Sequence, residues 1–169
     1  MNKVKIYLAT LFLISLAGAS HAQNPIAIGQ SQANFGVGLS SWGIPLYVGL
    51  DHGVHENVTI GGELSYRSFN DRYRNFRYNH SIFGVSGNAN FHFNALLDIP
   101  KEWNFYAGLN LGFYHWSSPS DYGGNYNSGL GLGAQIGGRY YFKENLGVNL
   151  ELGGGSVFSG GKFGLSFKL

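Results

Sequence analysis

The feature that most constrains this chain is a regular alternation of apolar residues with small or polar ones, from Asn104 to Leu169. Successive side chains of a strand point to opposite faces, so each alternating run predicts a ribbon with one apolar and one polar face. The apolar parity comprises Phe105, Ala107, Leu109, Leu111 and Phe113, and it returns in Leu130–Ile136, Leu146–Leu152 and Phe163–Leu169.

The polar parity carries more charge than the interior of a soluble β-protein tolerates. A closed barrel in lipid reverses the usual order, with apolar side chains outside and polar ones inside. We expect the charges to fill the lumen as an ion-pair network in which Glu63 and Glu151 pair with Arg139 or a lumenal lysine, because an unpaired buried charge is costly. The predicted network comprises Glu63, Arg67, Arg139, Glu151, Lys162 and Lys168, with Asp51 as a further candidate.

The N-terminus has the pattern of a secretory signal. Lys3 and Lys5 precede an apolar run over residues 6–16, and small residues follow up to Ala22. The run is shorter than the roughly 20 apolar residues that a spanning helix needs, so we predict a signal peptide over 1–22 that is cleaved after Ala22. Residues 23–169 then form one domain.

Charge and cysteine content exclude several classes of protein. Without residues 1–22, nine basic and nine acidic residues remain, so a nucleic-acid partner has no support. The chain has no cysteine and therefore no lipid-modified N-terminal cysteine. Five histidines remain, but none forms a metal-ligand motif. We predict neither a metal nor a cofactor. The five histidines are His52, His55, His80, His92 and His115.

Alternating runs and turn signals predict an all-β fold, an eight-stranded antiparallel up-and-down transmembrane β-barrel with both termini in the periplasm. Long external loops are expected at Arg67–Asn79 and Ser117–Asn127. The predicted strands are Ala33–Ser40, Ile44–His52, Val58–Ser68, His80–His92, Asn104–His115, Ser128–Phe142, Leu146–Ser156 and Lys162–Leu169.

The last eight residues are similar to the C-terminal assembly signal of outer-membrane barrels, with a polar residue, a glycine two positions on, and hydrophobic residues third from last and last. Those roles fall to Lys162, Gly164, Phe167 and Leu169, although many members end in phenylalanine. With the signal peptide and eight strands, the chain resembles the small eight-stranded outer-membrane β-barrel family (OmpA/OmpX-like, porin-fold). The resemblance implies a bacterial outer-membrane location, surrounding lipids and lipopolysaccharide, and insertion by the barrel-assembly machinery.

The first long loop alternates arginine with aromatic residues, which makes it the best candidate for a binding surface. Arginines beside aromatic rings suit the phosphates and sugars of lipopolysaccharide, or another extracellular ligand. The alternative is a solvated strand extension with cross-strand charge and aromatic pairs. The candidate residues are Arg72, Tyr73, Arg74, Phe76, Arg77 and Tyr78.

These patterns favour a non-enzymatic, monomeric outer-membrane protein with a structural or surface-interaction role. One alternative is a narrow passive pore for small ions or solutes, since an eight-stranded barrel has an interior just wide enough for side chains. Another is a soluble secreted barrel that holds an apolar ligand. A third is a lipid-modifying enzyme at the rim, for which the nearby residues are His115, Ser117, Ser118, Ser120 and Asp121.

Overall fold

A computed structural model describes residues 26–73, 76–120, 122–124, 127–156 and 159–169, and for residues 71–73 it describes the backbone only. The predicted signal peptide, residues 1–22, lies outside the described residues. Within these residues, one short helix and eight strands follow one another. They are β1 (Ser31–Ser40), β2 (Leu46–His55), β3 (Val58–Tyr73), β4 (Phe76–His92), α2 (Asn94–Leu97), β5 (Trp103–Ser117), β6 (Gly129–Tyr141), β7 (Leu146–Gly155) and β8 (Gly160–Lys168).

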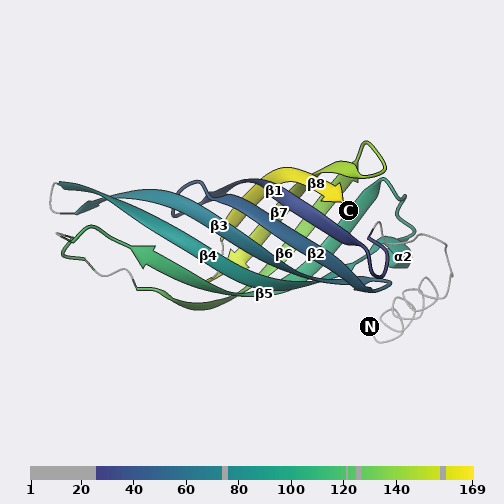
Figure 1. Cartoon of the computed structure of the whole chain (residues 1–169), viewed down its shortest axis with the longest axis horizontal. Helices are drawn as coiled ribbons and strands as arrows, with labels where there is room; N and C mark the ends of the chain where they lie inside the picture. Colours follow the sequence, from purple (N-terminus) through teal and green to yellow (C-terminus); the bar gives the residue numbers. More distant parts are fainter. Residues whose placement is uncertain (1–25, 74–75, 121, 125–126, 157–158) are drawn as a thin grey trace, which may run out of the picture.

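Each strand pairs antiparallel with the next, and β1 pairs with β8, so the sheet closes into a barrel in chain order (Figure 1). Closure leaves no edge strand whose backbone groups lack partners, which is the condition for crossing a bilayer with strands. The predicted eight-stranded, up-and-down antiparallel barrel is confirmed. No helix of the described residues has the length and apolar character needed to cross a membrane.

The barrel is apolar outside and polar inside, as the alternation predicts. Leu109, Ile136 and Leu150 are 69%, 60% and 57% exposed, whereas Asn104 and Arg139 of the opposite parity are buried. Phenylalanines and leucines continue this apolar outer surface around all eight strands. A surface of this kind is stable only when lipid covers it.

The strands differ greatly in length, and this gives the two ends of the barrel different shapes. β3 and β4 pair from Val58 opposite Phe91 to Tyr73 opposite Phe76, and they extend past the shorter strands as one long hairpin (Figure 1). We call this the hairpin end. The opposite end carries the C-terminus and α2, and we call it the terminal end.

The long hairpin corrects the predicted loop at Arg67–Asn79. Most of that segment is paired strand, and the expected strand ends at Ser68 and His80 were wrong. Beyond the lipid, a strand no longer needs an apolar outward side chain at every second position. Its hydrophobic pattern therefore fades although its hydrogen-bonded pairing continues. The other long loop starts and ends close to the expected positions, between β5 and β6.

Glycines on the inward parity make room for large lumenal side chains. A Cβ atom on Gly108 would collide with the Asn90 amide, and one on Gly137 would collide with the ring of Tyr106. The narrow interior therefore holds its polar side chains only because a neighbouring strand offers a glycine opposite them.

Candidate functional site: the polar lumen and the hairpin end

A three-residue charge cluster crosses the middle of the lumen. Lys162 Nζ of β8 lies 2.8 and 2.9 Å from the two carboxylate oxygens of Glu63 on β3, and 3.1 Å from Glu151 Oε1 on β7. Tyr106 of β5 donates a hydrogen bond of 2.8 Å to Glu151 Oε2. The structure thus brings both glutamates to a lumenal lysine, one of the two partner types expected from the sequence.

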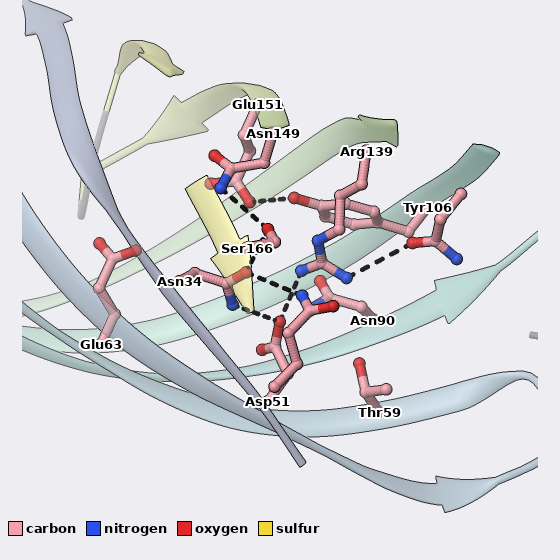
Figure 2. A network of polar contacts seen from close by, with 12 residues as sticks. Asn34, Asp51, Thr59, Glu63, Asn90, Tyr106, Arg139, Asn149, Glu151 and Ser166 are labelled. Atoms are coloured by element: carbon pink, nitrogen blue, oxygen red, sulfur yellow. Dashed lines mark hydrogen bonds and ion pairs between the residues drawn. The ribbon is translucent and has the colours of Figure 1, made fainter. Parts of the chain in front are cut away.

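Arg139 forms a separate pair with Asp51, nearer the terminal end. Arg139 Nη2 lies 2.5 Å from Asp51 Oδ2, and each side chain is 3% exposed. Asn34 donates to the same carboxylate oxygen at 2.9 Å, and the guanidinium lies 4.4 Å from the centre of the Tyr106 ring. Figure 2 shows Asp51 and Arg139 at the centre of these contacts, with Glu63 apart from them. Asp51, only a further candidate from the sequence, is therefore the partner of Arg139.

Uncharged side chains link these charges to the barrel wall. Tyr47 donates to Asn149 Oδ1 at 2.6 Å. Asn149 donates to Ser166 Oγ at 3.0 Å, and Ser166 donates to Asn34 Oδ1 at 2.7 Å (Figure 2). Tyr141 donates to Gln32 Oε1. The sequence prediction missed these residues because it followed charged groups alone. Their inward parity is the signal that identifies them.

On the wall formed by β4, β5 and β6, a chain of amides fills the lumen. Asn110 donates to Gln135 Oε1 at 2.7 Å, and Gln135 donates to Asn90 Oδ1 at the same distance. Buried amides of this kind stabilise a unique packing when their hydrogen bonds are satisfied.

A histidine and amide group closes the terminal end. His92 Nε2 lies 3.0 Å from Thr59 Oγ1, and His92 Nδ1 lies 3.0 Å from Asn104 Oδ1. Asn104 donates to Asn94 Oδ1 at 3.1 Å, and Asn94 donates to the Trp103 carbonyl at 2.7 Å. Asn94 is the first residue of α2, so this group anchors the helix to the start of β5.

Two predicted network members do not join an ion pair. No carboxylate of the described residues lies within ion-pair distance of Arg67 or Lys168. The Arg67 guanidinium lies 5.5 Å from the ring centres of both Trp42 and Tyr114, and Lys168 Nζ lies 3.8 Å from the ring centre of Tyr141. Among the side chains that the structure describes, aromatic faces rather than ion-paired carboxylates contact these two cations, which differs from the expected ion pairs.

Among the described residues, a small cavity lies on each side of the Lys162 cluster in the lumen. The hairpin-side cavity is bounded by Arg67, Tyr114 and Lys162, and the terminal-side cavity by Lys162, Arg139 and Asp51. Each has about 20 Å³ of free space, which is room for about one water molecule. The side chains therefore separate the interior into two compartments and leave no wide channel between them.

Aromatic side chains close the lumen toward the hairpin end. Ile82 and Tyr114 are buried there, and Trp42, Phe69 and Trp116 pack against them. The Trp42 and Trp116 rings meet edge to face at 5.4 Å. Trp42 lies in the short turn between β1 and β2, so this turn folds over the mouth of the barrel.

The two histidines at the rim, His80 and His115, each lie close to a serine hydroxyl. His115 Nδ1 lies 3.4 Å from Ser128 Oγ, whereas it is His80 whose Nδ1 lies 2.9 Å from Ser118 Oγ. His80 is fully buried against the ring of Tyr122, with ring centres 4.5 Å apart. Asp121 lies outside the described residues. No group of three or more acidic or histidine side chains in the described part of the chain is arranged to hold a metal ion.

The hairpin sorts its alternating residues onto two faces. Ser68, Asn70, Arg77 and Asn79 are exposed on the outward face, where Ser68 donates to Asn79 Oδ1 at 2.6 Å. On the inward face, Tyr78 packs against Tyr122 with ring centres 5.1 Å apart.

The six candidate binding residues are described to different extents. Phe76, Arg77 and Tyr78 are the first three residues of β4. Tyr73 pairs with Phe76 and Arg72 pairs with Arg77 in the register, whereas Arg74 lies outside the described residues. Two arginine positions therefore face each other across the hairpin.

The residues of the resembled assembly signal all lie on β8 or just after it. Lys162 and Gly164 are on the inward parity, and Phe167 and Leu169 are exposed on the outward one. β8 closes the barrel against β1, where Phe167 pairs with Ala33. Recognition of these residues by an assembly machinery stays a prediction.

No family model matches the sequence, and no curated protein does. Solved structures do match. The outer membrane protein OprG from Pseudomonas aeruginosa superposes with a TM-score of 0.67 at 8% identity, over 86% of this chain and 99% of OprG. The chain has the fold of the small eight-stranded outer-membrane β-barrels.

Two further structures with this fold agree. The N-terminal β-barrel domain of Pseudomonas aeruginosa OprF matches with a TM-score of 0.59 at 17% identity, over 84% of this chain and 98% of that domain. The Yersinia pestis outer membrane protein Ail in a nanodisc matches with a TM-score of 0.55 at 14% identity, over 83% of this chain and 99% of Ail. All three are bacterial outer-membrane proteins, which supports the same location for this barrel.

Proposed function

We propose that this chain is a non-enzymatic, monomeric protein of the bacterial outer membrane whose β3–β4 hairpin binds anionic groups of lipopolysaccharide outside the cell. The apolar outer surface and the fold it shares with outer-membrane proteins support the location. In this arrangement the terminal end lies in the periplasm and the hairpin end lies outside. Insertion by the barrel-assembly machinery through Lys162, Gly164, Phe167 and Leu169 belongs to the same proposal.

The closed lumen supports a structural role for the barrel. Side chains of β3, β7 and β8 meet at Lys162 and fill the cross-section, and each remaining cavity holds about one water molecule. Such an interior makes the barrel a rigid support for the hairpin above it.

The distribution of charge along the chain supports an anionic ligand. Outside the lumen, the hairpin tip has three arginines and one aspartate, Asp71. The segments at the terminal end have two lysines, Lys101 and Lys143, against four carboxylates. The basic surface charge is therefore concentrated at the end that we place outside the cell. The four carboxylates are Glu56, Asp98, Glu102 and Glu144.

The observation that carries the proposal is the pairing of Arg72 with Arg77 across the hairpin. Like charges at directly opposite positions of an antiparallel pair destabilise the pair. An anion of the ligand that binds between the two arginines would therefore offset their electrostatic repulsion. Arginine also binds phosphate through two parallel hydrogen bonds. The outward Ser68, Asn70 and Asn79 offer hydrogen bonds to sugar hydroxyls just below the arginines.

The test compares binding of the purified barrel to lipopolysaccharide vesicles before and after replacement of Arg72, Arg74 and Arg77 with glutamine. Each arginine near an anionic lipid surface contributes about 1 kcal/mol, so we expect the triple variant to bind about 100-fold more weakly. Dephosphorylated lipopolysaccharide should reduce binding of the unchanged protein by a similar factor. The matched control is Lys101→Gln with Lys143→Gln, which should bind like the unchanged protein. Equal affinity of the arginine variant and the unchanged protein would refute the proposal.

A second function, a narrow gated pore, is favoured by the position of the two cavities. They are separated by the single layer that Lys162 forms with Glu63 and Glu151, and both are lined in part by Lys162. Displacing that one side chain would join them. Planar-bilayer recordings test this function: Lys162→Gln should increase the open time or the conductance of any steps seen with the unchanged protein. Absence of steps for both proteins would reject the pore.

A further inference from the structure

Arg67 is a buried cation that forms no ion pair with a carboxylate of the described residues. Arg67 is 3% exposed, and its guanidinium lies over the rings of Trp42 and Tyr114. Its guanidinium donates a hydrogen bond of 3.2 Å from Nη1 to Ser40 Oγ and also interacts with the Tyr114 hydroxyl, whereas its Nε has no hydrogen-bond partner among the described residues. A buried charge without a counter-charge is strongly disfavoured, and two aromatic faces compensate only part of that cost.

The hairpin-side cavity next to Arg67 has positive surroundings. Its charged lining residues are Arg67, Lys162 and Glu63, which leave a formal charge of +1. The terminal-side cavity is lined by three carboxylates and two cations, which leave a formal charge of −1. The residues that line the two cavities are neutral in sum, with three cations and three carboxylates, but their charges are unevenly distributed along the axis, and of the two cavities the one beside Arg67 favours an anion.

The same cavity offers hydrogen-bond donors and limits the size of its occupant. The buried Tyr114 hydroxyl lines it beside the Arg67 guanidinium and makes no hydrogen bond of standard geometry to a described residue, and the hydroxyls of Ser65 and Ser86 line it as well. About 20 Å³ of free space admits a particle close in size to one water molecule. Sulfate, phosphate and sugars are too large for this space, whereas a halide ion is the common anion nearest in size to water.

We propose that the hairpin-side cavity binds a single chloride ion, with Arg67 as its counter-charge and Tyr114 as a hydrogen-bond donor. The bound ion supplies a negative charge in contact with Arg67, which no carboxylate of the described residues provides. The site does not include the hairpin arginines, so a failure of lipopolysaccharide binding would not exclude chloride binding, and the reverse also holds.

The first test locates the ion in the unchanged protein. Crystals of the detergent-solubilised barrel grown with bromide in place of chloride should show one anomalous peak within hydrogen-bond distance of the Arg67 guanidinium. A water molecule at that position with no anomalous signal would overturn the proposal, as would bromide found only on the outer surface.

The second test measures affinity through stability. We expect the melting temperature to rise with chloride concentration relative to gluconate at the same ionic strength, because gluconate is too large for the cavity. Arg67→Gln should weaken the apparent chloride affinity about tenfold or more. The matched control is Lys168→Gln, which removes another lumenal cation that lies over an aromatic ring, at the terminal end, and should leave the chloride response unchanged. Arg67→Lys, which keeps the charge, should retain part of the response and serves if the glutamine variant does not fold. Equal melting temperatures of the unchanged protein in chloride and gluconate would refute the site.

Discussion

Replacing Asp51 with asparagine tests whether buried charge pairs hold the barrel together. Asp51 accepts hydrogen bonds from Arg139 at 2.5 Å and from Asn34 at 2.9 Å, and both charged side chains are 3% exposed. Asparagine keeps the shape of the side chain but removes its charge, so the Arg139 guanidinium stays buried without a counter-charge. Because removing one partner of a buried ion pair costs about 3–5 kcal/mol, we expect the free energy of unfolding to fall by about that amount.

Removing both charges separates the pair energy from the cost of burial. In Asp51→Asn with Arg139→Gln, no uncompensated charge remains, so the double variant should lose less stability than the sum of the two single variants. The difference, which is the coupling energy of the pair, should be about 2 kcal/mol, within the range found for contacting residues.

Equilibrium unfolding in urea, with the barrel in lipid vesicles and tryptophan fluorescence as the signal, gives these free energies. The matched control is Glu56→Gln, because Glu56 is an exposed carboxylate in the turn between β2 and β3 and should change stability by less than about 0.5 kcal/mol. A loss below about 1 kcal/mol for Asp51→Asn, or strict additivity in the double variant, would show that Arg139 does not depend on Asp51.

Two further substitutions examine the two faces of the wall. Ile136→Arg places a charge on the apolar outer face. It should lower the free energy of unfolding by about 2–4 kcal/mol for a position near the bilayer centre, as measured by urea unfolding in vesicles. An unchanged unfolding midpoint would contradict a lipid-facing Ile136. Gly137→Val directs a side chain at the ring of Tyr106 and should lower the free energy of unfolding by about 1–3 kcal/mol. Gly154→Ala is the control, because its added methyl group meets open space and should leave stability nearly unchanged. Equal losses for both variants would contradict the inference that the lumen has no room for a side chain at Gly137.

The inside-out barrel is predictable because two simple rules act together at every position of a strand in lipid. Alternation assigns Leu150 and Glu151 to opposite faces, and the cost of burying charge in hydrocarbon decides which face is which. The structure agrees: Leu150 is exposed, and Glu151 contacts Lys162 in the lumen. Strand identity and facing direction are local properties, so one sequence suffices to give them.

The extent of β3 and β4 was not predictable from the same rules. Between Ser68 and Asn79 the outward positions are occupied by serine, asparagine and arginine, which are also common in loops. The inward positions still carry Phe69, Tyr78 and His80, and these pack into the aromatic cluster at the mouth. Half of the strand signal is therefore present in the sequence. It becomes decisive only when the partner strand supplies the matching register.

The partners inside the lumen depend on distances around the barrel, which alternation does not contain. Inward parity places Asp51, Glu63 and Glu151 in the same interior, but their heights along the axis follow from the register of eight strands. That register brings Glu63 and Glu151 to Lys162 and assigns Asp51 to Arg139, which leaves Arg67 among aromatic rings. The charges that line the two cavities cancel in sum, so their total does not reveal that one cavity is positive and the other negative. The heights of the charged side chains along the barrel axis make one cavity positive and the other negative. A small ion that enters from the hairpin end therefore meets the positive cavity before the negative one.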